Sequence, residues 1–158
     1  MRCPRALKKI LDQQLTSRRE ISSDNPDETF EAGRETAAIV PQDGTVLLVG
    51  ELGAGKTLFA KGLGQGLGID PSEITSPTYI IVEEHRGSRQ VFHIDLYRIE
   101  TDAEYDEIGL WEILDGPGVK IVEWAEKLDP ERCACHVAVF IEDAGGDKRR
   151  IEIYSSDI

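Results

Sequence analysis

The sequence lacks any long apolar run. None of its 158 residues belongs to an uninterrupted apolar stretch of the roughly 20 residues that a membrane-spanning helix needs. The first nineteen residues, MRCPRALKKILDQQLTSRR, contain basic side chains but not the apolar core of a signal peptide. Internal repeats and low-complexity tracts are also missing. These absences predict a cytoplasmic protein without a membrane segment, and the length suits one domain with its own core.

Cysteine is scarce and odd in number. Three cysteines in a chain of this size argue against a disulfide framework and fit a reducing compartment. Cys133 and Cys135 would share one face of a strand, with His136 beside them. A zinc site normally needs four ligands, and the sequence offers no second pair. We therefore interpret these cysteines as buried or half-buried thiols.

Positive charge is in short supply as well. The formal net charge is −12 and the pI is about 4.7, so the molecule as a whole should repel nucleic acid. Residues 1–19 are basic instead, with six basic residues and one acidic residue. The rest of the chain therefore carries a net charge of −17. We predict a loosely ordered basic extension over residues 1–19 and one domain over residues 20–158. A nucleic-acid-binding arm is the alternative for the extension.

What the sequence does contain is a phosphate-binding motif, TVLLVGELGAGKT, over residues 45–57. It matches G-x-x-x-x-G-K-[ST] at every fixed position, which are Gly50, Gly55, Lys56 and Thr57. TVLLV predicts a buried parallel strand, and KTLFAKGLGQGL predicts a helix that begins at the lysine. The glycines let consecutive backbone N–H groups face a phosphate, and the positive end of the helix adds to the attraction. Lys56 would contact the β- and γ-phosphates, and Thr57 a bridging magnesium ion.

Such a loop also needs a carboxylate at the end of a neighbouring strand, to hold the magnesium shell and to orient water. Two apolar runs end in an acid: VFHID at Asp95 and VKIVE at Glu123. A third run, VAVFIED, ends at Glu142 and Asp143, but it leads straight into a C-terminal hairpin and ranks lower. The candidate catalytic residues are therefore Lys56, Asp95 and Glu123.

The remaining pattern predicts an α/β fold with a mixed sheet. A helix capped by Asn25 should end at Pro41, and Gly68 should end the helix after the phosphate loop. The glycines at positions 62, 64 and 66 weaken that helix, and we attribute them to close packing against the sheet. Residues 101–109 predict an acidic helix. The predicted strands cover residues 18–23, 45–49, 79–84, 90–98, 119–124, 135–143 and 149–156, and they include two hairpins.

Asparagine is nearly absent, since Asn25 is the only one in the chain. Guanine-specific switch proteins contact the base through Asn-Lys-x-Asp, and the nearest approach here, EKLD at residues 126–129, begins with glutamate. Adenine is therefore the favoured base. A small-molecule kinase would usually add an arginine-rich lid over its second substrate, whereas the arginines of this chain are scattered.

Four segments together resemble one known family. GELGAGKT, SPTY, HIDLYR and VEW, in this order and spacing, are similar to the bacterial TsaE (YjeE) family. These small ATPases take part in making threonylcarbamoyladenosine beside the anticodon of certain tRNAs. The likeness runs from about Ile21 to the C-terminus. It implies a P-loop NTPase-like, three-layer α/β fold around a mixed central sheet.

The resemblance also implies roles for single residues. Asp95 would take a Walker-B-like role, Glu123 would be a further magnesium or water-orienting acid, and Trp124 would lie beside the nucleotide. Thr78, in the SPTY segment, would belong to a switch that responds to the γ-phosphate. The implied ATP-binding residues are Gly50, Glu51, Leu52, Gly53, Ala54, Gly55, Lys56, Thr57, Thr78 and Trp124, and the implied Mg²⁺ ligands are Thr57, Asp95 and Glu123.

Members of this family act with the TsaD and TsaB proteins, and their ATP turnover is thought to reset that complex between modification cycles. By this resemblance the chain would be a slow ATPase that meets tRNA only indirectly, which suits its acidic charge. Its adenine slot would draw on the helix start near Asn25 and the hairpin near Gly146. A nucleotide-dependent binding module and a small-molecule kinase remain the alternatives.

Overall fold

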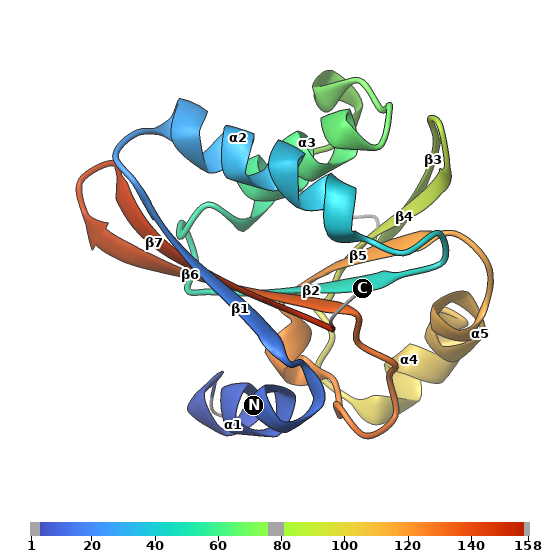
Figure 1. The fold of residues 1–158 in the computed structure, drawn as a ribbon. Coiled ribbons are helices and arrows are strands. Elements are labelled where there is room, and N and C mark those ends of the chain that lie inside the picture. Colours follow the sequence, from blue (N-terminus) through green and yellow to red (C-terminus); the bar gives the residue numbers. More distant parts are fainter. Residues whose placement is uncertain (1–3, 76–80, 157–158) are drawn as a thin grey trace.

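A seven-stranded sheet forms the centre of the molecule (Figure 1). The computed structural model describes residues 4–75 and 81–156. The strand order is β1-β7-β6-β2-β5-β4-β3. The strands are β1 Ser17–Ser23, β2 Thr45–Val49, β3 Val82–Arg86, β4 Gln90–Asp95, β5 Val119–Glu123, β6 Val137–Gly145 and β7 Lys148–Ser155.

The sheet is mixed, as the sequence predicts. Strand β2 pairs in parallel with β5 on one side and β6 on the other, and β5 pairs in parallel with β4. The β3–β4, β6–β7 and β1–β7 pairs are antiparallel. All residues of β2 and β5 are buried, because helices cover both faces of these strands. The parallel arrangement brings the carboxyl ends of β2, β5 and β4 to one edge of the sheet.

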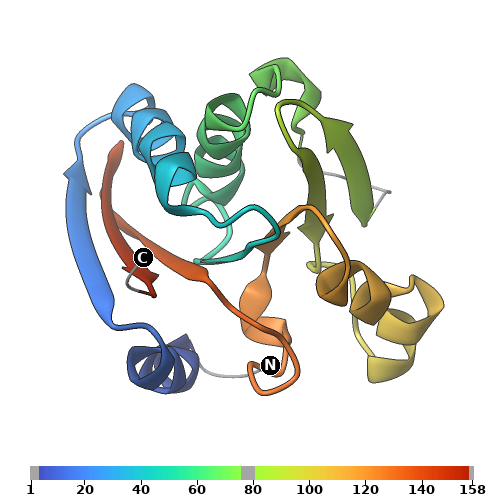
Figure 2. The same cartoon turned by 45° about the vertical axis from the view of Figure 1, so that its right-hand side comes forward.

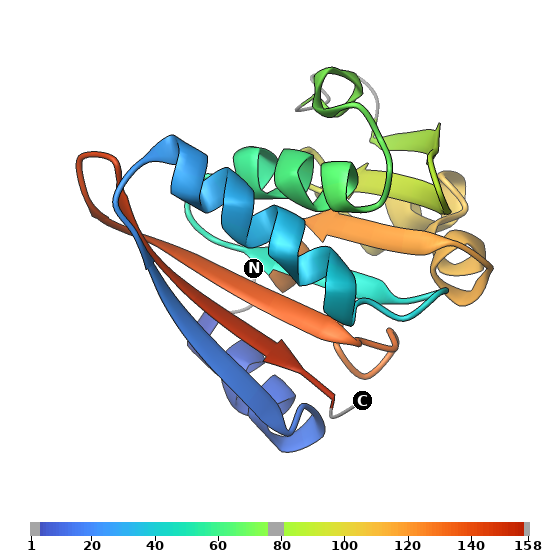
Figure 3. The same cartoon turned by 45° about the horizontal axis from the view of Figure 1, so that its top comes forward.

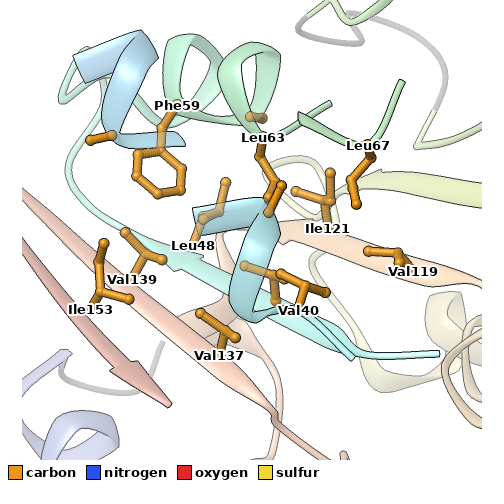
Figure 4. Packing of buried hydrophobic residues seen from close by; sticks show 14 of the residues in the cluster. Val40, Leu48, Phe59, Leu63, Leu67, Val119, Ile121, Val137, Val139 and Ile153 are labelled. Carbon is orange, nitrogen blue, oxygen red and sulfur yellow. The ribbon is translucent and has the colours of Figure 1, made fainter. Parts of the chain in front are cut away.

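Helices cover both faces of the sheet and complete three layers (Figure 2). Helices α2 Pro26–Thr36 and α3 Lys56–Gly66 lie on one face, and α1 Pro4–Gln14, α4 Asp102–Glu107 and α5 Leu110–Asp115 lie on the other. Short 3₁₀ turns occupy Ala37–Ile39, Pro71–Glu73 and Ala125–Lys127. Successive residues of β2 serve the two cores in turn: Leu48 packs under α2 and α3, and Leu47 packs on the α1 side. Figure 4 shows Phe59 and Leu63 of α3 above Leu48. No helix of the described residues is long and apolar enough to cross a membrane.

Helices α2 and α3 lie side by side across the sheet (Figure 3), and glycines allow this close approach. A Cβ on Gly62 would stand 1.9 Å from the backbone oxygen of Phe30, and one on Gly66 would stand 2.5 Å from the Cβ of Ala37. A Cβ on Gly64 would stand 2.0 Å from Cδ1 of Ile74. The packing explanation for the three helical glycines is confirmed, although the partner is mainly α2 rather than the sheet.

The N-terminal segment corrects one prediction. Residues 4–14 form helix α1 rather than a loosely ordered extension, and residues 17–19 already belong to strand β1, so the predicted boundary at residue 19 cuts through a strand. Leu7, Leu11 and Leu15 recur every four residues and are buried against the sheet. An apolar stripe with this spacing is a stronger signal for packing than the basic charge of the segment, because it gives the helix a face to bury.

Candidate nucleotide-binding site

The phosphate loop connects β2 to α3 and contains two residues in the left-handed region. Gly53 has φ 79° and Gly55 has φ 108°, which side chains with a Cβ rarely adopt. A Cβ on Gly50 would stand 2.6 Å from the backbone oxygen of Ile141, so the loop also needs glycine in order to lie against β6. Gly55 caps α3 and supplies no side-chain hydrogen bond to it. Within the described residues, no side chain caps the first N–H groups of α3, which suits an anion at this helix end.

The ammonium group of Lys56 lies buried inside the curve of this loop. Its Nζ donates hydrogen bonds to the backbone oxygens of Gly50 and Glu51 and lies 3.9 Å from the ring centre of Trp124. Burial lowers the pKa of Lys56, and the charges of Glu126 and Glu123 act in the opposite direction. This lysine is thus a desolvated positive charge placed where the loop would surround phosphates.

Two buried carboxylates lie beside the loop, at the ends of neighbouring strands. Asp95 ends β4 and Glu123 ends β5, and the two residues pair directly in the parallel register. The Thr57 hydroxyl donates to Glu123 Oε1 at 2.9 Å, so the first turn of α3 is joined to the end of β5. Asp95 Oδ1 accepts the backbone N–H of Tyr97 at 2.9 Å. Burial and the neighbouring Glu123 raise the pKa of Asp95, despite that hydrogen bond.

The donor set of this corner fits magnesium. A hydroxyl and two carboxylates are hard oxygen ligands, and Mg²⁺ in nucleotide sites usually takes one or two carboxylates together with phosphate oxygens and water. Within the part of the chain that the structure describes, no group of three or more His, Cys, Asp and Glu side chains could hold a metal ion by itself. Thr57, Asp95 and Glu123 would therefore share the ion with a bound polyphosphate.

Trp124 follows Glu123 with an unusual backbone conformation. Its φ of 59° makes it the one residue other than glycine with a positive φ among those described. The left-handed turn places the indole beside the Lys56 ammonium, and the ring of Tyr97 packs against it at a tilt of 40°, with 5.0 Å between the ring centres. Leu52 and Tyr97 are 74% and 51% exposed, so two large apolar side chains remain open to solvent around the loop. The predicted site residue Thr78 lies outside the described residues.

Arg149 is a residue at this site that the sequence analysis misses. Its Nε donates to the backbone oxygen of Ala54 at 2.8 Å, and its Nη2 donates to that of Gly53 at 3.3 Å. The side chain thereby ties the β6–β7 hairpin to the phosphate loop and holds these two carbonyl groups. The strand pattern of residues 148–155 carries no signal for this contact, because it depends on how the hairpin lies over the loop.

His93 is the second residue that the sequence analysis leaves without a role. Its Nε2 lies 2.5 Å from Glu123 Oε2, on the side of the carboxylate opposite Thr57. A signal was available, because His93 precedes Asp95 by two residues on a strand and so points to the same face of the sheet. The predicted Lys56, Thr57, Asp95, Glu123 and Trp124 do come together, whereas the lower-ranked Glu142 and Asp143 are exposed on β6.

A glycine loop after a central parallel strand, with acids at the ends of two adjacent strands, defines a P-loop α/β protein. The chain belongs within this class to the TsaE family, since the model described as "Threonylcarbamoyl adenosine biosynthesis protein TsaE" matches residues 23–151. Helix α1 precedes the matched region.

Individual relatives agree with this assignment. The chain is 39% identical over 128 residues to the Bacillus subtilis (strain 168) tRNA threonylcarbamoyladenosine biosynthesis protein TsaE, covering 80% of this chain and 79% of that one. The Aquifex aeolicus protein of the same name is 33% identical, with 86% and 96% covered. The crystal structure of Bacillus subtilis YdiB superposes with a TM-score of 0.70 at 34% identity, covering 89% of this chain and 87% of that one.

Proposed function

We propose that this protein is a magnesium-dependent ATPase required for threonylcarbamoyladenosine modification of tRNA. Its hydrolysis of ATP would drive or reset a partner complex of the TsaB and TsaD proteins. The membership of the TsaE family supports the pathway. The adenine preference rests on the missing Asn-Lys-x-Asp contact.

One observation carries the enzymatic part of the proposal. The Thr57 hydroxyl of the phosphate loop lies 2.9 Å from Glu123 Oε1, and Glu123 is the register partner of Asp95. A loop that only held phosphates would need its amides and Lys56, but no acids at the ends of two adjacent strands. Buried acids beside the loop hydroxyl are the arrangement that metal-assisted phosphoryl transfer requires.

The roles of the residues follow from their positions. The loop amides and the Lys56 ammonium would bind the β- and γ-phosphates, where desolvation strengthens their electrostatic attraction. Thr57 and Asp95 would hold magnesium, which when bound neutralises charge on the phosphates. Glu123 would complete the metal shell or orient the attacking water. Arg149 would keep the loop in its binding shape through Gly53 and Ala54.

A nucleotide-dependent binding module is the second candidate, and the exposed apolar residues beside the loop favour it. Leu52 lies on the loop itself and Tyr97 lies two residues beyond Asp95, and both are more than half exposed. Large exposed apolar side chains at a functional edge are typical of contact surfaces. In this candidate ATP would fix the shape of that surface, and Asp95 and Glu123 would serve binding only.

The net charge of −12 argues against direct binding of tRNA by this chain. A strongly acidic molecule gains no general attraction to a polyanion. We therefore place the tRNA contact with the partner proteins.

The experiment that tests the proposal is steady-state ATP hydrolysis by the purified protein, alone and with TsaB and TsaD added. We expect slow hydrolysis alone, dependence on Mg²⁺, and a rate that changes when both partners are present. ATP-dependent assembly with the partners but no hydrolysis would select the binding module. Transfer of phosphate to a small acceptor, or hydrolysis indifferent to the partners, would contradict the proposal.

A further inference from the structure

His93 lies completely buried in the middle of the sheet, beside the carboxylate at the end of β5. Its side chain is 0% exposed, and that of Glu123 is 2% exposed. The 2.5 Å separation of Nε2 and Oε2 places the two atoms in direct hydrogen-bond contact. Glu123 is thus held from two sides: by the ring of His93 at Oε2 and by the hydroxyl of Thr57 at Oε1.

The other ring nitrogen indicates which form of the imidazole is present. Nδ1 of His93 is buried and has no hydrogen-bond partner among the described residues. A buried N–H without an acceptor costs more than a buried lone pair, so a proton on Nδ1 is disfavoured. A ring proton on Nε2 agrees with both observations, because Nε2–H then donates to the Glu123 carboxylate.

We infer that His93 is the positioning residue for Glu123, and that its Nε2–H orients the carboxylate toward Thr57 and the metal position. The inference rests on the proposed function, because Glu123 needs a fixed direction only if it serves magnesium or water. A carboxylate with one oxygen held by a buried donor can rotate only by breaking that bond. Its Oε1 is therefore directed at the first turn of α3, where the hydroxyl of Thr57 meets it.

The same geometry would also arise if His93 merely filled a buried polar position in the core. The two roles differ in what the loss of the donor would change. A core residue affects the free energy of unfolding alone. A positioning residue affects metal dependence, because partners of a metal ligand typically change metal affinity or activity by about 10–100-fold.

The test uses a pair of substitutions at this position and one control. His93→Leu removes the donor and keeps the bulk, whereas His93→Gln keeps an N–H near the place of Nε2. His136→Leu is the control, because His136 Nδ1 accepts the backbone N–H of Thr45 at the opposite end of β2. The readouts are the Mg²⁺ concentration for half-maximal ATP hydrolysis, Mn²⁺ binding to the protein–ADP complex by electron paramagnetic resonance, and ADP affinity in excess EDTA.

We expect His93→Leu to raise the half-maximal Mg²⁺ concentration and to weaken Mn²⁺ binding by about tenfold or more, with metal-free ADP affinity unchanged. His93→Gln should recover most of the loss, and His136→Leu should match the parent in both metal readouts. Metal dependence in His93→Leu within twofold of the parent would overturn the inference. If that variant does not fold, a His93→Gln protein with a tenfold metal defect would overturn it as well.

Nitrogen NMR of the unmodified protein gives an independent readout. We expect one imidazole with a slowly exchanging Nε2–H and an unprotonated Nδ1, assigned to His93 by its disappearance in His93→Gln. A proton on Nδ1 of His93 would overturn the inference, whatever the activity. A parent protein without ATP hydrolysis would defeat the proposed function alone, since the NMR and Mn²⁺ results would still decide the role of His93.

Discussion

Three buried charged side chains lie close together at the carboxyl ends of β2, β4 and β5. Lys56, Asp95 and Glu123 are 6%, 6% and 2% exposed, although charged side chains are rarely buried without a partner. Each is held by hydrogen bonds from or to neighbouring groups rather than by a simple ion pair. Burial lowers the pKa of Lys56 and raises that of Asp95. Opposite pKa shifts on a buried lysine and a buried aspartate that lie close together are typical of functional sites.

The substitution Glu123→Gln tests the catalytic assignment at this scale. It removes the negative charge but keeps the shape and an oxygen for Thr57, so nucleotide affinity should stay within about threefold. Hydrolysis should fall by about a hundredfold or more, because the metal or water loses its orienting charge. ATP binding by calorimetry and steady-state phosphate release measure the two effects. Glu112→Gln, at an exposed acid of α5, is the control and should leave both unchanged. Equal rates in Glu123→Gln and the parent would refute the assignment.

At the scale of elements, the position of α3 depends on its contact with α2. Gly33 of α2 and Gly62 of α3 face the backbone of the opposite helix, and a Cβ on Gly33 would stand 2.1 Å from the backbone oxygen of Phe59. The two helices are therefore closer together than helices with larger side chains at the contact. Since α3 carries Lys56 and Thr57 at its first turn, this contact also sets where the phosphate loop ends.

Replacement of Gly62 by alanine should therefore destabilise the protein despite the better helix propensity of alanine. The gain from propensity is at most about 1 kcal/mol. A Cβ 1.9 Å from the Phe30 oxygen forces the helices apart, and overpacking of this kind typically costs about 1–3 kcal/mol. Urea unfolding should show a lower midpoint for Gly62→Ala. Gln65→Ala, at an exposed position of the same helix, is the matched control and should leave the urea midpoint unchanged. A Gly62→Ala protein more stable than the parent would show that the helices adapt without cost.

On the scale of the whole molecule, Glu152 of β7 joins the N-terminal helix α1 to the edge of the sheet formed by β1 and β7. This buried carboxylate on β7 accepts hydrogen bonds from Lys8 of α1 at 2.7 Å, Arg18 of β1 at 3.0 Å and the hydroxyl of Tyr154 at 2.8 Å. Burial alone would raise its pKa, but the contacts with Lys8 and Tyr154 outweigh burial and lower the pKa to about 2. Helix α1 is thus fixed by an ion pair as well as by its leucines.

This network predicts a specific loss of stability in acid. The folded-state pKa of about 2 lies below the ordinary value of 4.5, so the stabilisation is complete above about pH 4.5 and disappears as the pH falls toward 2. Lys8→Met should lower the free energy of unfolding at pH 7 by about 1–2 kcal/mol, and the difference from the parent should vanish near pH 2. Denaturant titrations across this range measure it. Lys9→Met, at the exposed neighbour on the same helix, should have nearly the parent's free energy of unfolding at any pH. A loss of stability in Lys8→Met that persists unchanged at pH 2 would exclude the ion pair as its cause.

Much of the fold could be predicted from local patterns in the chain. The loop motif places Lys56 and Thr57, and the apolar runs that end at Asp95 and Glu123 identify strands whose carboxyl ends meet. Asn25 does cap α2, since its side chain accepts the N–H of Glu28 at 3.0 Å. The prediction of a loosely ordered extension is wrong for residues 4–14, because the spacing of three leucines, and not the net charge, decides that this segment packs as a helix. The spacing of apolar residues can be read from the sequence, but the surface on which they pack cannot.

The sequence by itself determined the phosphate loop, the alternation of strands and helices, and the two strand-end acids, because each depends on residues that are close together in the chain. Only the tertiary structure decided that His93 holds Glu123, that Arg149 holds the loop at Ala54, and that Lys8 reaches Glu152. These pairs are separated by 30, 95 and 144 residues. The physical reason is that a hydrogen bond needs two groups within about 3 Å, and over such separations only strand order and register bring them together.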